Sequence, residues 1–222
     1  WPGDPQETRR AGLSFAYLKQ PDAIYRESFA TIRKEVDFSG CPEQIAKVAV
    51  RLMHSCGMTD LLDELVWHPQ VVESGCDALQ CGAPVLCDVR MVVEGVMRER
   101  LPAQNAVRCW IDDPGVREEA KSRNCTRALV ATERWLPELA GAVVVIGNAP
   151  TALFHLLEGI AEGWPEPAAI LAFPVGFVGA AESKVAVAEF ARVPFITLHG
   201  RRGGSAMAAA AVNALMMMGA PA

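Results

Sequence analysis

The sequence predicts an α/β protein built on one doubly wound, mainly parallel sheet of about five strands. From about residue 83 onward, five short apolar runs alternate with segments of helical periodicity. Parallel neighbours need crossover connections of a dozen or more residues, and helices of this length supply them while covering both faces of the sheet. The expected strands are residues 83–87, 106–111, 142–146, 168–173 and 195–198.

Apolar residues spaced by three and four positions mark the helices before and between these strands. Pro42 suits the first turn of the second helix, and Gly57 is placed to end it. Thr59 or Asp60 suits the cap of a short following helix, and Thr126 suits the cap of a later one. The other expected helices are residues 24–35, 89–100, 115–123, 128–136, 151–162, 180–191 and 206–218.

Length and composition fit one globular domain, residues 1–222, with residues 1–16 as a flexible polar tail. The formal net charge of −5 argues against a nucleic-acid partner, because such proteins usually carry a basic surplus. The most apolar helix, residues 206–218, is too short and too rich in alanine to cross a membrane, and no signal peptide is visible. The seven cysteines lack C-x-x-C spacing and suit buried thiols in a reducing cytosol, so we expect a cytoplasmic protein.

The loops after the expected strands gather at one edge of such a sheet, where ligands bind in open parallel folds. Each loop also leads into the N-terminus of a helix, whose free N–H groups and positive dipole end favour anions. The architecture therefore predicts an anionic ligand, and both a nucleotide and a polycarboxylate satisfy it. The loops are residues 88–90, 112–114, 147–151, 174–179 and 200–205.

Basic side chains cluster at the same predicted edge. Arg127 follows the expected cap Thr126, and Arg90, Arg201 and Arg202 lie just beyond strand ends. Together these arginines suit several carboxylates, because a guanidinium binds a carboxylate through two parallel hydrogen bonds. Each arginine alone also fits a solvated surface charge. Lys184 belongs to this edge too, although the Glu-Ser-Lys triplet that it ends also fits simple helix capping and pairing.

His54 is the best candidate for acid–base chemistry. It lies in the last turn of the helix that ends at Gly57, off the apolar stripe. The partial negative charge of a helix C-terminus favours an imidazolium, so we expect a pKa raised toward physiological pH, as a general acid requires. The alternative is a histidine that only caps carbonyls. His199, beside the last Gly-rich loop, is the second candidate.

Common cofactor and metal motifs are missing from the sequence. It contains no G-x-G-x-x-G, no G-x-x-x-x-G-K-[ST] and no G-x-S-x-G. The four histidines are dispersed without H-x-x-x-H spacing, so we expect neither a metal nor a cofactor. A nucleotide bound by an irregular Gly-rich loop stays open.

Four segments together resemble the precorrin-8X methylmutase family of cobalamin biosynthesis. Residues 203–207 and the pair Thr126 and Arg127 also fit, and the resemblance runs from about Tyr17 to Met218. Each motif alone is weak, whereas their order and spacing are specific. The four segments are residues 25–33, 51–58, 147–154 and 174–184.

The resemblance implies an isomerase that moves a methyl group from carbon 11 to carbon 12 of precorrin-8X and yields hydrogenobyrinic acid. It implies no redox cofactor, a homodimer, and a polycarboxylate tetrapyrrole as ligand. His54 matches the histidine thought to protonate the macrocycle, and Ser28 matches a serine that contacts substrate. The other residues we expect to contact substrate are Arg127, Asn148, Thr151, Gly176, Lys184, Gly204 and Ser205.

Three alternatives stay open at this point. The protein fits a carrier that holds a tetrapyrrole without chemistry, or a nucleotide-dependent transferase of similar architecture. The natural substrate is either metal-free or, as in the anaerobic pathway, cobalt-precorrin-8. Residues 55–58 resemble the metal-free branch more closely.

Overall fold

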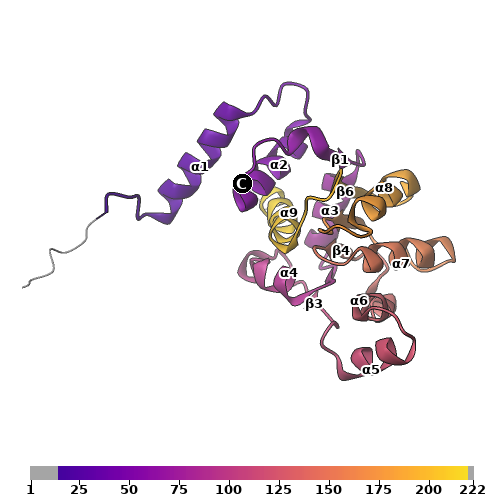
Figure 1. Ribbon diagram of the computed structural model, residues 1–222. Coiled ribbons are helices and arrows are strands. Elements are labelled where there is room, and N and C mark those ends of the chain that lie inside the picture. The colour runs from indigo at the N-terminus through magenta and orange to yellow at the C-terminus, as the bar shows by residue number, and fades with distance from the viewer. Residues whose placement is uncertain (1–14, 220–222) are drawn as a thin grey trace, which may run out of the picture.

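The computed structural model describes residues 15–219. Its strands form one six-stranded sheet in the order β1-β6-β5-β4-β2-β3, and helices pack around it (Figure 1). All pairs of neighbours are parallel except β1 and β6. The five expected strands are present and the α/β class is confirmed. The strands are β1 Leu65–Trp67, β2 Val85–Cys87, β3 Val107–Arg108, β4 Val143–Ile146, β5 Ala169–Ala172 and β6 Phe195–Leu198.

The sequence analysis missed β1, because three residues after a short 3₁₀ turn give too little periodicity to detect. It also missed α3. The α-helices are α1 Pro21–Glu35, α2 Glu43–Cys56, α3 Val71–Gln80, α4 Arg90–Gly95, α5 Pro114–Ser122, α6 Arg127–Glu133, α7 Pro150–Ala161, α8 Ala180–Phe190 and α9 Ser205–Met218. The 3₁₀ helices are η1 Leu62–Glu64, η2 Arg98–Arg100 and η3 Leu136–Glu138.

Helices cover both faces of the sheet, as a doubly wound fold requires. Side chains alternate along each strand, so β4 directs Val143 and Val145 to one core and Val144 and Ile146 to the other. The first core packs beneath α2, α3, α4 and α9, and the second beneath α6, α7 and α8. Within residues 15–219, no helix has both the length and the apolar character needed to cross a bilayer.

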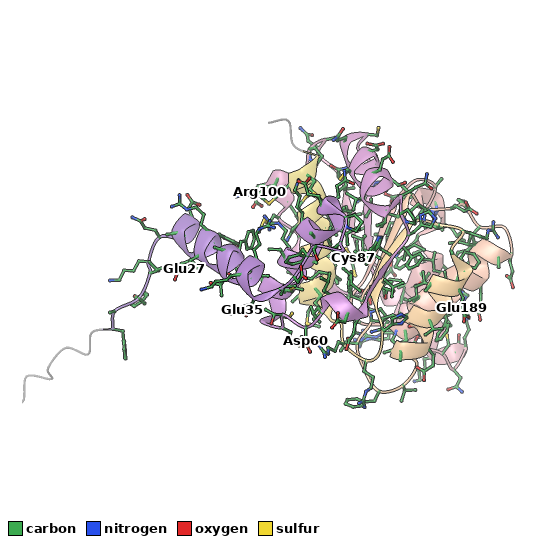
Figure 2. The ribbon with its side chains drawn as sticks, turned by 90° about the horizontal axis from the view of Figure 1, so that it is seen from above. Glu27, Glu35, Asp60, Cys87, Arg100 and Glu189 are labelled. Carbon is green, nitrogen blue, oxygen red and sulfur yellow. The ribbon has the colours of Figure 1, made fainter. Side chains whose placement is uncertain are left out.

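Helix α1 stands away from this body and touches it mainly through α2 (Figures 1 and 2). Ile32 is its single buried residue. The segment before it exposes large apolar side chains, with Phe15 at 68% and Tyr17 at 67% exposure. The expected tail, residues 1–16, lies outside the described residues except for its last two positions.

Two local expectations were wrong. The helix expected at residues 89–100 breaks after Gly95, because Asn213 of α9 captures the freed backbone: its amide nitrogen donates to the Gly95 carbonyl at 2.9 Å, and its oxygen accepts from Met97 N–H at 3.0 Å. Neither Thr59 nor Asp60 caps η1, which begins after Leu61 without a side-chain cap. Thr126 does cap α6, accepting a hydrogen bond from Leu129 N–H at 3.2 Å.

Candidate active site

His54 lies in the last turn of α2, where the sequence places it. Gly57 ends the helix in the left-handed conformation at φ 71°, which glycine adopts without a Cβ penalty, and its N–H donates to the Met53 carbonyl at 2.7 Å. Two aromatic rings of α1 contact the imidazole, with centroids 5.1 Å away for Tyr25 and 5.3 Å for Phe29. The protruding helix α1 therefore forms one wall of the histidine site.

Ser28, also on α1, fixes the orientation of the ring. Its Oγ lies 2.7 Å from His54 Nδ1. When the hydroxyl donates to Nδ1, the proton of the neutral imidazole sits on Nε2. Nε2 has no hydrogen-bond partner among residues 15–219. The structure thus brings together Ser28 and His54 and leaves one ring nitrogen available for a ligand.

The expectation of a raised histidine pKa was wrong for the ligand-free protein. Burial lowers the pKa of His54 below its ordinary value, and the neighbouring Arg51 guanidinium lowers it further. Burial and the full positive charge of Arg51, one turn away, both oppose the effect of the helix C-terminus, which favours an imidazolium. A negative charge added beside this site would oppose the shift.

His54 stands between two cavities. The larger has a volume of about 590 Å³, within the usual range for ligand pockets, and its wall includes Ser28, Glu27 and Thr59. The smaller, about 250 Å³, is lined by Arg51, Tyr25 and, among others, the side of α9 that carries Ala206 and Asn213.

Asp88 organises the loop after β4, a role that the sequence analysis missed. The carboxylate is buried, at 1% exposure, and accepts hydrogen bonds from the backbone N–H groups of Gly147, Asn148 and Ala149 at 2.8–2.9 Å. Burial raises the pKa of Asp88 while these donors oppose the rise. The signal was an aspartate directly after a fully apolar strand, a position that usually has a structural or functional reason.

Three expected contact residues lie around this loop. Asn148 is exposed at the start of α7, and Thr151 Oγ1 lies 2.7 Å from Thr126 Oγ1, which ties α7 to α6. Arg127 lies 3.8 Å from Asp112, an aspartate that is also 3.5 Å from Arg90. The arginines of this edge are therefore partly neutralised by the protein itself.

The remaining expected contacts gather where α8 and α9 begin. Gly176 and Gly204 have φ of 145° and 123°, values that favour glycine, and Gly204 N–H donates to the Phe173 carbonyl at 2.8 Å. Ser205 Oγ, at the N-terminus of α9, is buried without a hydrogen-bond partner among the described residues. Because a buried orphan hydroxyl is rare, it suits a ligand contact.

Lys184 is buried at 1% exposure, and its ammonium donates to the Arg202 carbonyl. Burial lowers the pKa of Lys184 to about 8. In this structure Lys184 holds the Gly-rich loop through this hydrogen bond, and its expected contact with substrate stays a prediction. Arg202 itself forms a two-pronged pair with Asp60 at 2.7 and 2.8 Å.

A family model for precorrin-8X methylmutase matches residues 23–218 of the chain. The chain belongs to the precorrin-8X methylmutase family. The match covers every element that builds the site, from α1 with Ser28 to the end of α9. The protein is accordingly an isomerase with a role in cobalamin biosynthesis, as the sequence resemblance implied.

Relatives in two branches of the family cover most of the chain. A precorrin-8X methylmutase of Pseudomonas aeruginosa is 56% identical, covering 90% of this chain and 96% of the relative. A cobalt-precorrin-8 methylmutase of Priestia megaterium is 36% identical, with 90% and 88% covered. The solved precorrin-8X methylmutase of Thermus thermophilus superposes with a TM-score of 0.83 at 37% identity, covering 89% of this chain and 96% of that one.

Within this family fold the expected residues fall into two groups. The histidine group contains Ser28 and His54 between α1 and α2. The strand-end group contains Arg127, Asn148 and Thr151 by α6 and α7, and the glycines with Ser205 by α8 and α9. The two groups meet at the N-terminus of α9, because Ala206, next to Ser205, lines the smaller cavity together with His54. Within the described residues, no group of three or more His, Cys, Asp or Glu side chains is placed to bind a metal ion.

Proposed function

We propose that this chain converts precorrin-8X into hydrogenobyrinic acid by moving a methyl group from carbon 11 to carbon 12, with His54 as general acid. The observation that carries the proposal is the His54 site itself. An imidazole oriented by Ser28 at 2.7 Å stands at the wall of a cavity of about 590 Å³ in a methylmutase-family fold. Its free Nε2 is the atom that would deliver the proton.

The chemistry follows from the charge of the ring. Protonation of the macrocycle withdraws electron density from the conjugated system and eases migration of the methyl group. The migration is intramolecular, so substrate and product have the same composition and no electron acceptor is needed. Ser28 suits this delivery, because its hydroxyl accepts from Nδ1–H both in the imidazolium and in the neutral ring that remains once Nε2 has given up its proton.

Substrate contacts would come from both groups of residues. The polycarboxylate side chains would meet Arg127, Asn148 and Thr151 at the strand-end loops, and the Gly176 loop and Gly204 would allow close approach to backbone N–H groups. The Ser205 hydroxyl, which has no hydrogen-bond partner in the described part of the chain, would form a hydrogen bond with the ligand. Lys184 would act through the Arg202 loop.

We propose the metal-free substrate over the cobalt form. The relatives named precorrin-8X methylmutase, from Pseudomonas aeruginosa and a Sinorhizobium species, are 56% and 51% identical. Those named cobalt-precorrin-8 methylmutase, such as the Priestia megaterium and Salmonella typhimurium enzymes, are 36% and 34% identical. Free thiols at all seven cysteines also suit a reducing cytoplasm, where we place the reaction.

We propose that the working form is a homodimer. The segment before α1 exposes Phe15, Tyr17 and Leu18, and Leu18 also lines the larger cavity. Apolar side chains exposed together are typical of an interface. Light scattering at working concentration is expected to give twice the chain mass, and a monomer mass would contradict the dimer.

The function is tested by incubating the purified protein with precorrin-8X and following the absorption change on conversion. Conversion to hydrogenobyrinic acid is expected, with cobalt-precorrin-8 as the parallel substrate. Binding of precorrin-8X without a spectral change would favour the carrier, and the absence of binding would overturn the proposal. Faster conversion of the cobalt form would assign the chain to the other branch.

A further inference from the structure

Arg51 occupies an unusual position beside His54. It precedes the histidine by one turn of α2 and lines the same 250 Å³ cavity. The side chain is partly buried, yet no carboxylate of residues 15–219 forms an ion pair with it. Its Nη2 donates instead to the thioether sulfur of Met217, which is a weak acceptor. A partly buried cation with such a partner lacks a counter-charge close to it.

A second guanidinium converges on the same sulfur. Arg100 of η2 places its Nη1 3.8 Å from Met217 Sδ, and Figure 2 shows it beside α9 (yellow). Arg100 likewise has no carboxylate partner in the described part of the chain. Burial lowers the pKa of Arg51, Tyr25 opposes this lowering, and the charge of Arg100 adds to it. Two like charges held together without a counter-ion favour an anion between them.

The charged groups around His54 leave this position open to an anion. Helix α1 contributes Glu27, on the wall of the larger cavity, and Tyr25 against the ring. Helix α2 contributes Arg51, and α9 has no ionisable side chain among its residues. On the Arg51 side, therefore, the positive charges of Arg51 and Arg100 dominate.

We propose that Arg51 and Arg100 form a subsite for one carboxylate side chain of the substrate, and that its binding promotes protonation of His54. The inference rests on the proposed function, since it assigns one part of the polycarboxylate ligand to one place. A carboxylate gains two charge-assisted hydrogen bonds from Arg51 in exchange for the weak thioether contact. The aromatic ring of Phe29, whose centroid lies 5.4 Å from the guanidinium, holds Arg51 in position for it.

The coupling follows from the charges. In the ligand-free protein, Arg51 opposes protonation of His54. A carboxylate on Arg51 neutralises this charge close to the imidazole, so the imidazolium becomes more favourable once substrate is bound. By linkage, protonation of His54 strengthens binding of the carboxylate by the same factor. His54 is thus more often protonated when substrate is bound than when it is absent.

Affinity for the product gives the first test. Hydrogenobyrinic acid is titrated against the native protein, Arg51→Gln, Arg100→Gln and the control Arg117→Gln, which makes the same charge change on the exposed face of α5. We expect Arg51→Gln to weaken binding about 10- to 100-fold, Arg100→Gln less, and Arg117→Gln not at all. Equal affinity of native protein, Arg51→Gln and Arg100→Gln would overturn the subsite.

The titration of His54 gives a readout that a structural role would not move. With labelled histidine, NMR follows the imidazole over pH with and without hydrogenobyrinic acid, and His54→Gln assigns the signal. In the native protein the product is expected to raise the His54 pKa. In Arg51→Gln the free value is expected to start higher and the product-induced rise to shrink. An unchanged rise would remove the coupling.

Failure of the subsite and failure of the proposed function give different results. If the native protein converts precorrin-8X and Arg51→Gln binds and titrates like it, the subsite alone is wrong. If the native protein binds product with the expected dependence on Arg51 but converts nothing, the proposed function is wrong. Thermal unfolding shows whether each variant is folded. If Arg51→Gln does not fold, the same titrations with Arg51→Lys and the exposed Arg100→Gln test the subsite in its place.

Discussion

The two regions expected to contact substrate treat their charges in opposite ways. At the strand ends, Arg127 and Arg90 share Asp112, at 3.8 and 3.5 Å, and Arg202 pairs with Asp60. Beside His54, Arg51 has a thioether as its hydrogen-bond acceptor and an aromatic ring over its guanidinium, and the histidine itself bonds to a neutral serine. The arginines of the strand-end loops are therefore paired with aspartates of the protein, whereas Arg51 beside His54 has no carboxylate partner among residues 15–219.

This difference indicates how each region would act on a polycarboxylate. An incoming carboxylate at the strand ends must compete with an aspartate already in place, and exposed pairs of this kind contribute only about 0–1 kcal/mol. At Arg51 it meets no such competitor. The strand-end loops are therefore suited to fitting the shape of the ligand and orienting it. The histidine site is suited to binding a carboxylate through its charge and to transferring a proton.

The largest expected effect comes from removing the acid. His54→Ala is expected to lower the rate of conversion about 10²- to 10⁴-fold, the usual contribution of a positioned general acid. Product affinity is expected to stay largely intact, because the arginines, Ser28 and the helix N-termini supply it. Steady-state kinetics on precorrin-8X and a product titration measure the two effects. The control His199→Ala changes the other histidine near the loops, and near-native turnover of His54→Ala would end the acid role.

The next largest effect concerns stability at the balanced region. Asp88→Ala leaves three backbone N–H groups of residues 147–149 without their acceptor, so we expect the free energy of unfolding to fall by about 3 kcal/mol. Asp88→Asn keeps one acceptor oxygen and is expected to lose less. Urea unfolding gives the numbers, with the exposed Asp112→Ala as the control within about 0.5 kcal/mol of native. A stability equal to native in Asp88→Ala would show that the loop does not depend on it.

A smaller effect is expected at Arg127. Because Asp112 competes for its guanidinium, Arg127→Ala is expected to weaken product binding by about 1 kcal/mol, the lower end of the range for a lost charge-assisted contact. Affinity is also expected to fall as salt rises. Conversely, Asp112→Ala frees the arginine and is expected to tighten binding slightly. Unchanged affinity of both variants at low and high salt would remove Arg127 from the site.

The smallest effect is the pH dependence contributed by His54. Its pKa in the folded protein lies below the ordinary 6.5, so the unfolded chain binds the proton more readily. The free energy of unfolding is therefore expected to decrease as pH falls from 6.5 through the folded-state pKa, and this component should vanish in His54→Gln. The same shift places the decline of kcat/KM with rising pH below 6.5, since that ratio reports the free enzyme. A decline only well above this pH would contradict the lowered pKa.

Much of the site could be predicted because its signals are local. Gly57 ends α2 one residue after Cys56 and so fixes where His54 sits on the helix, and Thr126 caps α6 through its own hydroxyl. The strands β4 and β5 are continuous apolar runs and were found for that reason. By contrast, β1 is recognisable only from its pairing with β6.

The sequence by itself determined the α/β class, the end of α2 at Gly57, the cap of α6 at Thr126 and the family motifs, because each depends on residues within a few positions of one another. The tertiary structure alone decided which charges are balanced. Asp88 reaches a loop some sixty residues later, and Arg51 meets Met217 and Arg100 from distant helices. The direction of the His54 pKa was misjudged because burial, which only the tertiary structure sets, is the largest cause of its lowering, and Arg51, one turn earlier on the same helix, lowers it further.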